Sequence, residues 1–311
     1  MKWTTDDIPD QTGRTVLVTG SNSGLGLRSA EALAAKGARV LMACRNATKA
    51  ATALDQVTAV ASGTKPEVVS LDLADLASVR ECAAKLVDAG ERIDVLMNNA
   101  GVMIPPLGRT ADGFEMQFGT NHLGHFAFTG LLMPALLRAD APRVVMTSSM
   151  AHFSGRIRWD DPNWETARYS KWLAYGQSKL ANLLFMSELG RQATEHGADL
   201  VSAAAHPGYA ATHLQTAAAK QTGARYREAV LTAGNRLFAQ SDAMGALPQL
   251  YAATAPDVSS GDYIGPNRLF GTRGHPHPAT MSPAARDKDA ARRLWELSEK
   301  LTDVAFAWPT G

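Results

Sequence analysis

Short apolar, β-branched runs alternate with longer amphipathic segments over the first two thirds of the chain. The apolar runs predict strands at residues 15–19, 39–43, 67–71, 93–97, 143–147 and 200–204. Apolar residues at three- and four-residue spacing predict helices at residues 25–36, 47–61, 76–89, 114–138 and 175–196. This alternation predicts an α/β fold: one doubly wound parallel sheet, joined by right-handed crossovers, with helices on both faces.

The alternation stops at residue 205. The next segment is polar and alanine-rich, with one helical stretch near residues 226–238. A helix at 241–254, a short strand at 262–264 and a loop rich in Gly, Pro and His at 265–278 are expected to follow. We therefore expect a single domain over residues 1–311, with a core at 13–205, a substrate loop or lid at 206–240 and a C-terminal helix at 282–301.

Composition narrows the possible functions. The chain is 45% hydrophobic and 20% charged with a formal net charge of +1, which fits a globular protein and argues against nucleic acid as the main partner. Cys44 and Cys82 are interpreted as reduced, buried residues, and no His or Cys stands at metal-ligand spacing, so no metal is expected. The polar N-terminus and the short apolar stretch at residues 126–137 predict a cytoplasmic protein without a membrane anchor.

A glycine-rich turn lies between the first predicted strand and the first predicted helix. Its glycines permit a tight turn and a close approach of backbone to a pyrophosphate, which the unpaired N–H groups of the helix N-terminus attract. This context predicts a dinucleotide site in a Rossmann-like fold. The expected cofactor contacts of the turn are Gly20, Ser21, Asn22, Ser23, Gly24, Leu25 and Gly26.

The end of the second predicted strand indicates which dinucleotide binds. An NAD-selective site places an acidic residue there, whereas this chain has Arg45, whose guanidinium suits a 2′-phosphate. We therefore predict NADP(H) in preference to NAD. After the third strand, Asp72 either receives the adenine amino group or caps the helix that begins near Asp75, and Leu73 is expected to line the same site.

Two residues of the last predicted core helix have the chemistry of a proton-transfer pair. Tyr175 and Lys179 are four residues apart and therefore project from one face of the helix. A tyrosine with a pKa of about 10 exchanges protons poorly at neutral pH, and an adjacent ammonium group favours its phenolate. The spacing predicts a tyrosine acid/base whose pKa Lys179 lowers.

Four motifs in this order resemble the short-chain dehydrogenase/reductase family. They are Thr19-Gly20-x-x-x-Gly24-x-Gly26, Asn98-Asn99-Ala100-Gly101, Ser148-Ser149 and Tyr175-x-x-x-Lys179. The resemblance implies that Tyr175 is the acid/base of a hydride transfer and that Lys179 also binds the nicotinamide ribose. It implies that Ser149 binds the substrate oxygen, with Ser148 as the competing candidate, and that Asn121 holds a proton-relay water. The further cofactor contacts it implies are Asn99, Ala100, Gly101, Pro207, Gly208 and Thr212.

The long interval at residues 150–174 is similar to that of the retinol dehydrogenase and WW-domain oxidoreductase branch of this family, and so is the C-terminal sequence at residues 293–298. This resemblance implies the reduction of apolar aldehydes with NADPH. The large side chains of the interval either form an apolar pocket wall or pack the insertion onto the core. They are Met150, Phe153, Trp159, Trp164 and Trp172.

We therefore expect an NADP(H)-dependent oxidoreductase that interconverts an apolar aldehyde or ketone and its alcohol. The alternatives are a non-catalytic NADPH-binding sensor or interaction protein on the same fold, and a C=C reductase resembling protochlorophyllide reductase. The expected partner is a small carbonyl or alcohol substrate. Family members commonly pair through helices that correspond to residues 114–138 and 175–196. The insertion and the C-terminal helix of this chain are placed to block some of those contacts. The sequence therefore leaves homo-oligomer formation open.

Overall fold

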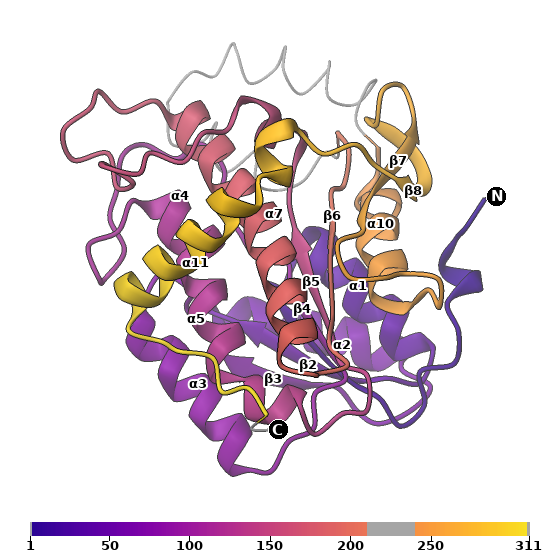
Figure 1. The fold of residues 1–311 in the computed structure, drawn as a ribbon. Coiled ribbons are helices and arrows are strands. Elements are labelled where there is room, and N and C mark those ends of the chain that lie inside the picture. Colours follow the sequence, from indigo (N-terminus) through magenta and orange to yellow (C-terminus); the bar gives the residue numbers. More distant parts are fainter. Residues whose placement is uncertain (1, 210–239, 310–311) are drawn as a thin grey trace.

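A computed structural model describes residues 2–209 and 240–309 (Figure 1). Its strands are β1 (Thr15–Thr19), β2 (Arg39–Cys44), β3 (Glu67–Ser70), β4 (Val95–Asn98), β5 (Arg143–Thr147), β6 (Val201–Ala205), β7 (Tyr263–Arg268) and β8 (Arg273–Pro278). They form one sheet in the order β3-β2-β1-β4-β5-β6-β7-β8. Strands β1 to β7 run parallel, and β8 pairs antiparallel with β7. The predicted doubly wound parallel sheet is confirmed.

Helices cover both faces of this sheet and divide the core into two apolar clusters. One face carries α1 (Gly24–Ala35), α2 (Ala47–Val60) and α10 (Asp242–Thr254), and the other carries α3 (Leu76–Asp88), α5 (Gly124–Leu131) and α7 (Lys171–Glu195). All five residues of β1 are buried, because both faces of this central strand are covered. That double burial explains why the core strands read as continuous apolar runs in the sequence.

The helix predicted at residues 114–138 is interrupted in the structure. It consists of α4 (Met116–Phe118), a π-helical turn η2 (Gly119–Leu123), α5 and α6 (Met133–Leu136). Pro134 stands in the first turn of α6, where its missing N–H ends the hydrogen-bond ladder of α5. The π-helical turn contains Asn121, so the irregular backbone coincides with a predicted site residue.

The C-terminal part differs from the prediction at two places. Residues 265–278, expected as a loop because of their Gly, Pro and His content, form most of the β7–β8 hairpin. Pro276 and Pro278 are tolerated because β8 lies at the edge of the sheet, where a missing N–H disrupts no further ladder. The helix expected at 282–301 is two elements, η4 (Pro283–Arg286) and α11 (Lys288–Thr302), because Asp287 caps a new helix after the first turn.

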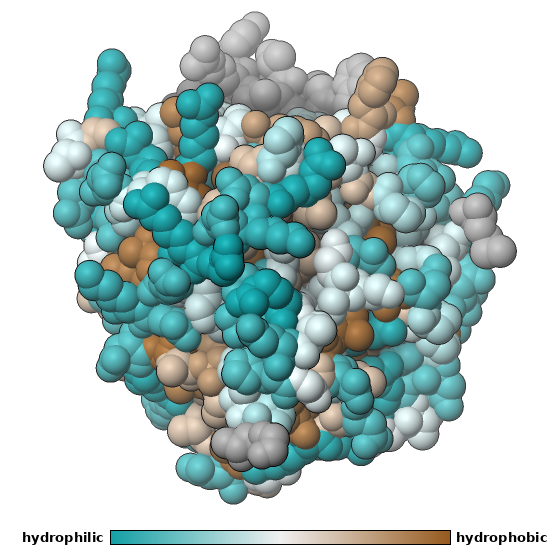
Figure 2. Space-filling view, viewed as in Figure 1, coloured by the Kyte–Doolittle hydropathy of each residue, from teal (hydrophilic) through white to brown (hydrophobic). Residues whose placement is uncertain are grey.

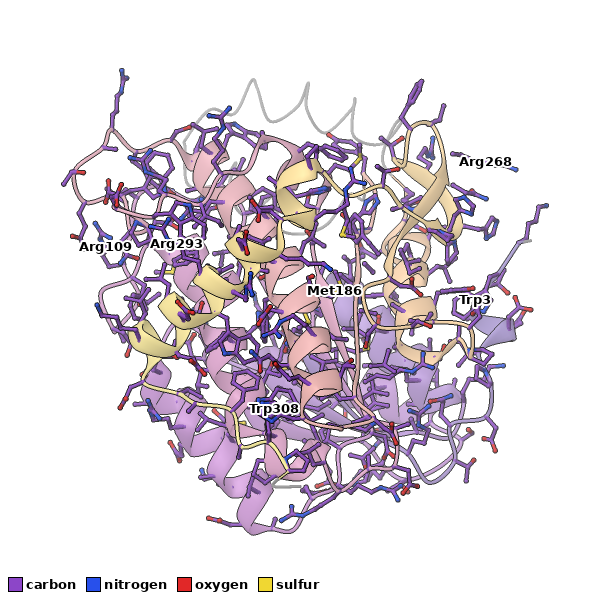
Figure 3. The ribbon with its side chains drawn as sticks, in the orientation of Figure 1. Trp3, Arg109, Met186, Arg268, Arg293 and Trp308 are labelled. Atoms are coloured by element: carbon purple, nitrogen blue, oxygen red, sulfur yellow. The ribbon has the colours of Figure 1, made fainter. Side chains whose placement is uncertain are left out.

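Helix α11 forms an outer layer across α7 and α5 (Figure 1). Leu294 and Trp295 of α11 are buried on its inner side. Its outward side chains give this face of the molecule a largely hydrophilic surface (Figure 2). Arg293 lies over the ring of Trp159 at 4.4 Å, and Trp308 of the following segment stacks on His196. Figure 3 shows where Arg293 and Trp308 lie. Within the described ranges, no helix combines the length and the apolar character needed to span a membrane.

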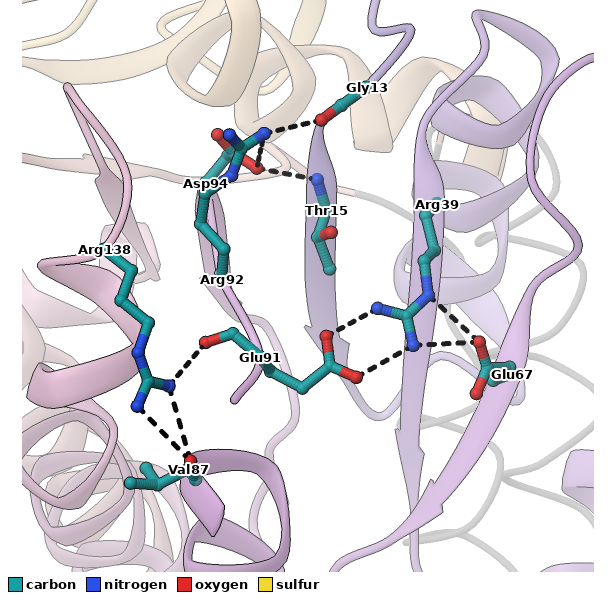
Figure 4. A network of polar contacts seen from close by, with 9 residues as sticks. All are labelled: Gly13, Thr15, Arg39, Glu67, Val87, Glu91, Arg92, Asp94 and Arg138. Atoms are coloured by element: carbon teal, nitrogen blue, oxygen red, sulfur yellow. Dashed lines mark hydrogen bonds and ion pairs between the residues drawn. The ribbon is translucent and has the colours of Figure 1, made fainter. Parts of the chain in front are cut away.

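A polar network closes the amino ends of the central strands (Figure 4). Arg39 at the start of β2 donates to both carboxylate oxygens of Glu91, at 2.5 and 2.9 Å, and to Glu67 at 3.0 Å. Arg138 donates to the backbone carbonyl of Glu91 at 2.9 Å. These charges are satisfied within the protein, so the network is structural.

Candidate active site

The carboxyl ends of neighbouring parallel strands meet at the opposite edge of the sheet. The sheet order reverses between β1 and β4, and ligands of doubly wound sheets bind at such a switch point. The glycine-rich turn follows β1 and Asn99 follows β4, so both lie at this point. Arg45, Ser149 and Pro207 follow β2, β5 and β6 at the same edge. The fold therefore gathers the predicted site residues from five strands.

The glycine-rich turn packs tightly against the end of β4. Gly20 has a φ of +67°, and a Cβ on it would lie 2.9 Å from the Cβ of Ala100. A Cβ on Gly26 would lie 2.5 Å from the carbonyl oxygen of Gly20. Ser23 precedes α1 without a side-chain cap hydrogen bond, which leaves the N–H groups of the first turn to a ligand. These features fit the pyrophosphate of a dinucleotide.

The side chains of the turn are less available than its backbone. Ser21 is fully buried, and its hydroxyl lies 3.4 Å from the Cys44 sulfur. Leu25 is also buried, in the first turn of α1. The predicted contacts of Ser21 and Leu25 with a cofactor are therefore restricted to backbone groups in this structure.

Arg45 and Asp72 meet beyond the ends of β2 and β3. Their side chains form an ion pair of 3.5 Å, and the Arg45 side chain is 68% exposed. Asp72 also accepts a hydrogen bond from the Ala74 N–H, whereas α3 is capped by Asp75, which accepts from Ala77. The alternative that Asp72 caps α3 is therefore wrong, because Asp72 accepts its hydrogen bond within the turn that precedes that helix. Leu73 is buried and packs closely against Gly124.

The residues after β4 lie at the carboxyl ends of the strands, beside the glycine-rich turn. Asn99 donates from its side chain to the Thr19 carbonyl at 2.7 Å, and the N–H groups of Asn99 and Ala100 both donate to the Thr19 hydroxyl at 2.9 Å. A Cβ on Gly101 would lie 3.0 Å from the Asn121 Oδ1 atom and 3.6 Å from the Lys179 Nζ atom. Small residues are needed here because α7 and η2 approach the strand end.

Tyr175, Lys179 and Ser149 come together above β5. The Lys179 Nζ atom lies 5.6 Å from the centre of the Tyr175 ring and donates to the Thr147 carbonyl at 3.1 Å. The Ser149 side chain lies beside the Tyr175 hydroxyl and lowers the pKa of that tyrosine. Ser148 instead donates to the Lys179 carbonyl at 2.8 Å and is buried. The structure thus brings Ser149, and not Ser148, to the tyrosine.

Burial dominates the electrostatics of this pair. It raises the pKa of Tyr175 to about 12, opposed by the neighbouring Ser149 side chain. It also lowers the pKa of Lys179 to about 8. The prediction that Lys179 lowers the pKa of Tyr175 therefore differs from the structure, because removing both groups from water disfavours both charged forms.

Asn121 uses its side chain to hold the loop after β4. It accepts from the Val102 N–H at 2.7 Å and donates to the Val102 carbonyl and the Ser178 hydroxyl, both at 2.9 Å. Its backbone carbonyl lies 3.0 Å from the His125 Nδ1 atom, and the other ring nitrogen of His125 lies 2.9 Å from the Thr19 hydroxyl. His125 therefore connects the π-helical turn to the glycine-rich turn, a contact that sequence reasoning missed.

The turn after β6 is only partly described. Gly208 has a φ of +67° and its N–H donates to the His206 Nδ1 atom at 3.3 Å. The Pro207 carbonyl accepts from the Gln240 side chain at 2.6 Å. Thr212 and most of the loop predicted as a lid at 206–240 lie outside the described residues.

Gln249 of α10 is a second residue that sequence reasoning missed. Its side-chain amide donates to the Ser29 hydroxyl at 2.7 Å and to the Asn99 Oδ1 atom at 3.2 Å, and it accepts from the Thr147 hydroxyl at 3.1 Å. It therefore joins α1, β4 and β5 beneath the site. Nothing in the local sequence marks this glutamine, because its partners are distant along the chain.

The large side chains of the insertion divide between the two predicted roles. Trp164 is buried and contacts Tyr169 and Arg158, and Trp159 packs against the core and Arg293. Trp172 and Phe153 are more than half exposed, and Met150 is 37% exposed. A cavity of about 380 Å³ opens beside η3 (Met150–Ser154) and is lined by Met150, Phe153, His206, Tyr263 and Phe270. Part of the insertion thus stabilises the core, and part leaves apolar surface beside the site.

Comparison with known proteins gives consistent matches. The family model of the short chain dehydrogenase matches residues 14–223. Human retinol dehydrogenase 13 is 40% identical over 297 residues, which cover 94% of this chain and 85% of that protein. Mouse retinol dehydrogenase 14 is 40% identical over 305 residues, which cover 94% and 86%.

Two solved structures extend these matches. An uncharacterised protein from Mycobacterium paratuberculosis is 45% identical with a TM-score of 0.81, covering 99% of this chain and 100% of its own. A short chain dehydrogenase from Escherichia coli CFT073, solved with NADPH, is 25% identical with a TM-score of 0.55, covering 67% of this chain and 82% of its own.

Proposed function

The chain belongs to the short-chain dehydrogenase/reductase family, as a retinol-dehydrogenase-like oxidoreductase of CH–OH groups with a nicotinamide cofactor, and from this we propose that it interconverts an apolar aldehyde or ketone and its alcohol with NADP(H). The observation that carries the proposal is the placement of the Lys179 Nζ atom 5.6 Å from the centre of the Tyr175 ring, at the sheet edge that holds Ser149 and the glycine-rich turn. A protein that only binds a dinucleotide does not need an acid/base tyrosine.

Arg45 supports NADP(H) over NAD. It is largely exposed at the end of β2, and its 3.5 Å pair with Asp72 is long enough for a phosphate to replace. Gly20, Gly24 and Gly26 would hold the pyrophosphate, with Ser23 and Asn22 at the helix N-terminus beside it. Asp72 and Leu73 would face the adenine, and Asn99, Ala100, Gly101, Pro207 and Gly208 the nicotinamide half. The E. coli relative solved with NADPH agrees with this choice.

The catalytic roles follow from the geometry of the three side chains. When bound, the nicotinamide supplies or accepts the hydride at the carbonyl carbon. Ser149 donates a hydrogen bond to the substrate oxygen as negative charge develops on it. Tyr175 gives that oxygen its proton in reduction and removes it in oxidation. Lys179, next to the tyrosine ring, would bind the nicotinamide ribose, and Asn121 holds the loop that carries Gly101 against it.

The apolar surroundings of the site support an apolar substrate. Exposed side chains of Met150, Phe153 and Trp172 lie on the insertion that begins at Ser149, and a cavity of about 380 Å³ opens beside them. The relatives named retinol dehydrogenases act, by those names, on an alcohol with a long apolar body. We propose a long-chain or polyene aldehyde as the substrate class.

Cofactor binding and turnover test this function together. Fluorescence titration is expected to show NADPH binding at least about tenfold tighter than NADH, and Arg45→Ala should remove that preference. Arg92→Ala is the matched control, because Arg92 donates to Gly13 at the far end of the sheet. Tyr175→Phe should keep the NADPH affinity and lose at least about a hundredfold in turnover of retinal or decanal.

Three outcomes would contradict the proposal at different points. A preference for NADH would overturn the role of Arg45. Retained turnover in Tyr175→Phe would remove the acid/base assignment. Failure of the wild-type protein to bind either nucleotide would favour the interaction-protein alternative.

A further inference from the structure

His152 lies three residues after Ser149 in the short helical turn η3 and is 1% exposed. Its Nδ1 atom lies 2.7 Å from the carbonyl oxygen of Ser149, and its backbone N–H donates to the same oxygen at 3.0 Å. The N–H of Ser282 lies 3.1 Å from the other ring nitrogen, Nε2. One imidazole thus links the proposed catalytic serine to the start of the C-terminal segment.

These two contacts require a single tautomer of a neutral imidazole. A carbonyl oxygen only accepts, so Nδ1 must carry the proton and donate to Ser149. A backbone N–H only donates, so Nε2 must be unprotonated and accept from Ser282. Burial lowers the pKa of His152 and so favours the neutral ring that this arrangement requires.

The packing around His152 keeps the ring in this orientation. The ring of Tyr263 on β7 meets it edge-on at 5.5 Å, and Phe153 lies against it at 4.2 Å between ring centres. Ser282 is itself 4% exposed and caps η4 by accepting from Ala285. The partner of Nε2 therefore belongs to a fixed backbone.

Ser149 is held at its carbonyl while its side chain faces Tyr175. The Ser149 hydroxyl accepts from the Ala151 N–H at 3.2 Å, so the backbone of this turn sets the position of the hydroxyl. Any rotation of the Ser149–Met150 peptide that follows loss of the His152 bond moves the serine relative to the tyrosine. Misplacement of a reacting group by about 1 Å costs up to about a hundredfold in rate.

We propose that His152 is a positioning residue that holds Ser149 against Tyr175 through its Nδ1–H, and that Ser282 of the C-terminal segment selects the tautomer able to do so. The inference rests on the proposed role of Ser149. Because the family model matches residues 14–223, Ser282 lies beyond it, and the C-terminal segment becomes part of the active-site support.

Three substitutions separate the two ring nitrogens. His152→Asn keeps an N–H donor near the position of Nδ1 and loses the acceptor for Ser282. His152→Gln places an acceptor near Nε2 and loses the donor to Ser149. His152→Phe keeps the ring and loses both contacts.

Turnover of retinal or decanal with NADPH is expected to fall at least about tenfold in kcat for His152→Gln and His152→Phe. His152→Asn should stay within about threefold of wild type, and the Kd for NADPH should not change in any variant. Equal kcat losses in His152→Asn and His152→Gln, or no loss in His152→Gln, would overturn the proposal, since a merely structural histidine gives no reason for the two to differ.

Ser149→Ala distinguishes failure of this inference from failure of the proposed function. If Ser149→Ala keeps full turnover, the proposed role of the serine is wrong. If Ser149→Ala loses turnover, His152→Gln should cost nothing further in that background, because the histidine acts through the serine. An additive loss in the double variant would overturn the positioning role.

The tautomer has its own spectroscopic signature. In protein labelled with ¹⁵N-histidine, the signals that disappear in His152→Asn should show a protonated Nδ1 and an unprotonated Nε2. The opposite pattern would overturn the proposal without reference to activity.

Discussion

Tyr175 and Lys179 show that the residues proposed for catalysis are held in an environment that opposes their charges. Burial raises the pKa of the tyrosine to about 12 and lowers that of the lysine to about 8. Among the residues that the structure describes, the ammonium group of Lys179 has one acceptor, the Thr147 carbonyl, which also accepts from Asn182. A buried charge with so little compensation costs folding free energy.

The cost of Lys179 predicts a pH-dependent gain in stability when it is removed. The unfolded chain binds its proton up to about pH 10.5 and the folded chain only up to about pH 8, so stability rises with pH across this interval. The penalty, on the order of 3 kcal/mol, is fully present below about pH 8. Lys179→Met should therefore raise the free energy of unfolding by about 1–3 kcal/mol at pH 7, with a smaller gain at pH 10.

Urea denaturation at the two pH values measures this gain, and turnover should be lost in the same variant. Lys85→Met is the matched control, because Lys85 is exposed and its pair with Glu81 raises its pKa. That control should show no gain at pH 7. A Lys179→Met protein that is less stable than wild type at pH 7 would contradict the assigned cost.

At the scale of elements, α10 is the support beneath the cofactor edge. It follows residues 210–239 in sequence, yet it packs on α1, and its Gln249 hydrogen-bonds residues of α1 and at the ends of β4 and β5. Gln249 is 2% exposed, so each of its hydrogen bonds replaces one that water would otherwise make. The glycine-rich turn therefore depends on a helix far from it in the chain.

Gln249→Leu is expected to lower the free energy of unfolding by about 1–3 kcal/mol, because the Ser29 hydroxyl, the Asn99 Oδ1 atom and the Thr147 hydroxyl each lose their hydrogen bond to this glutamine. The Kd for NADPH should rise about tenfold, since α1 begins at the proposed pyrophosphate site and Asn99 lies at the proposed nicotinamide site. Thermal denaturation and fluorescence titration measure the two effects. Gln56→Leu, on the exposed side of α2, should change neither, and an unchanged Kd in Gln249→Leu would contradict the supporting role.

At the scale of the whole molecule, the two ends of the parallel strands differ in what they carry. The amino ends of the strands are closed by the network around Arg39, whereas the carboxyl ends carry the turns and side chains of the site (Figure 4). Helix α11 adds a layer over α7 and α5, and Phe126, Phe185, Trp295 and Phe306 form an aromatic cluster beneath it. The outer faces of α5 and α7 are thus covered by α11 of the same chain.

Because α11 covers α5 and α7, we predict that the protein is a monomer in solution. The apolar face of α5 and α7 already buries Leu294 and Trp295, so it offers no large apolar surface to a second copy. Sedimentation equilibrium over an about hundredfold concentration range should give the mass of a single chain throughout. A mass that rises to two chains with concentration would contradict the prediction.

The sequence alone was enough to predict most of the sheet and the main groups of the proposed site. The parallel strands, the glycine-rich turn and the Tyr175–Lys179 pair depend on periodicity and short spacing, which act within one element or one strand–helix unit. The same local rules failed for the β7–β8 hairpin, because the position of a proline at a sheet edge is a property of the sheet and not of the segment.

The tertiary structure decided what depends on residues far apart in the chain. Ser149 rather than Ser148 lies beside Tyr175, because the Ser148 hydroxyl donates to the backbone carbonyl of Lys179 in α7. Gln249 reaches Ser29, and the N–H of Ser282 reaches His152, across long stretches of sequence. Burial, which sets the pKa values of Tyr175 and Lys179, likewise arises only when all layers pack together. Local sequence encodes the groups that carry the chemistry, whereas their partners and their electrostatics are fixed by long-range packing.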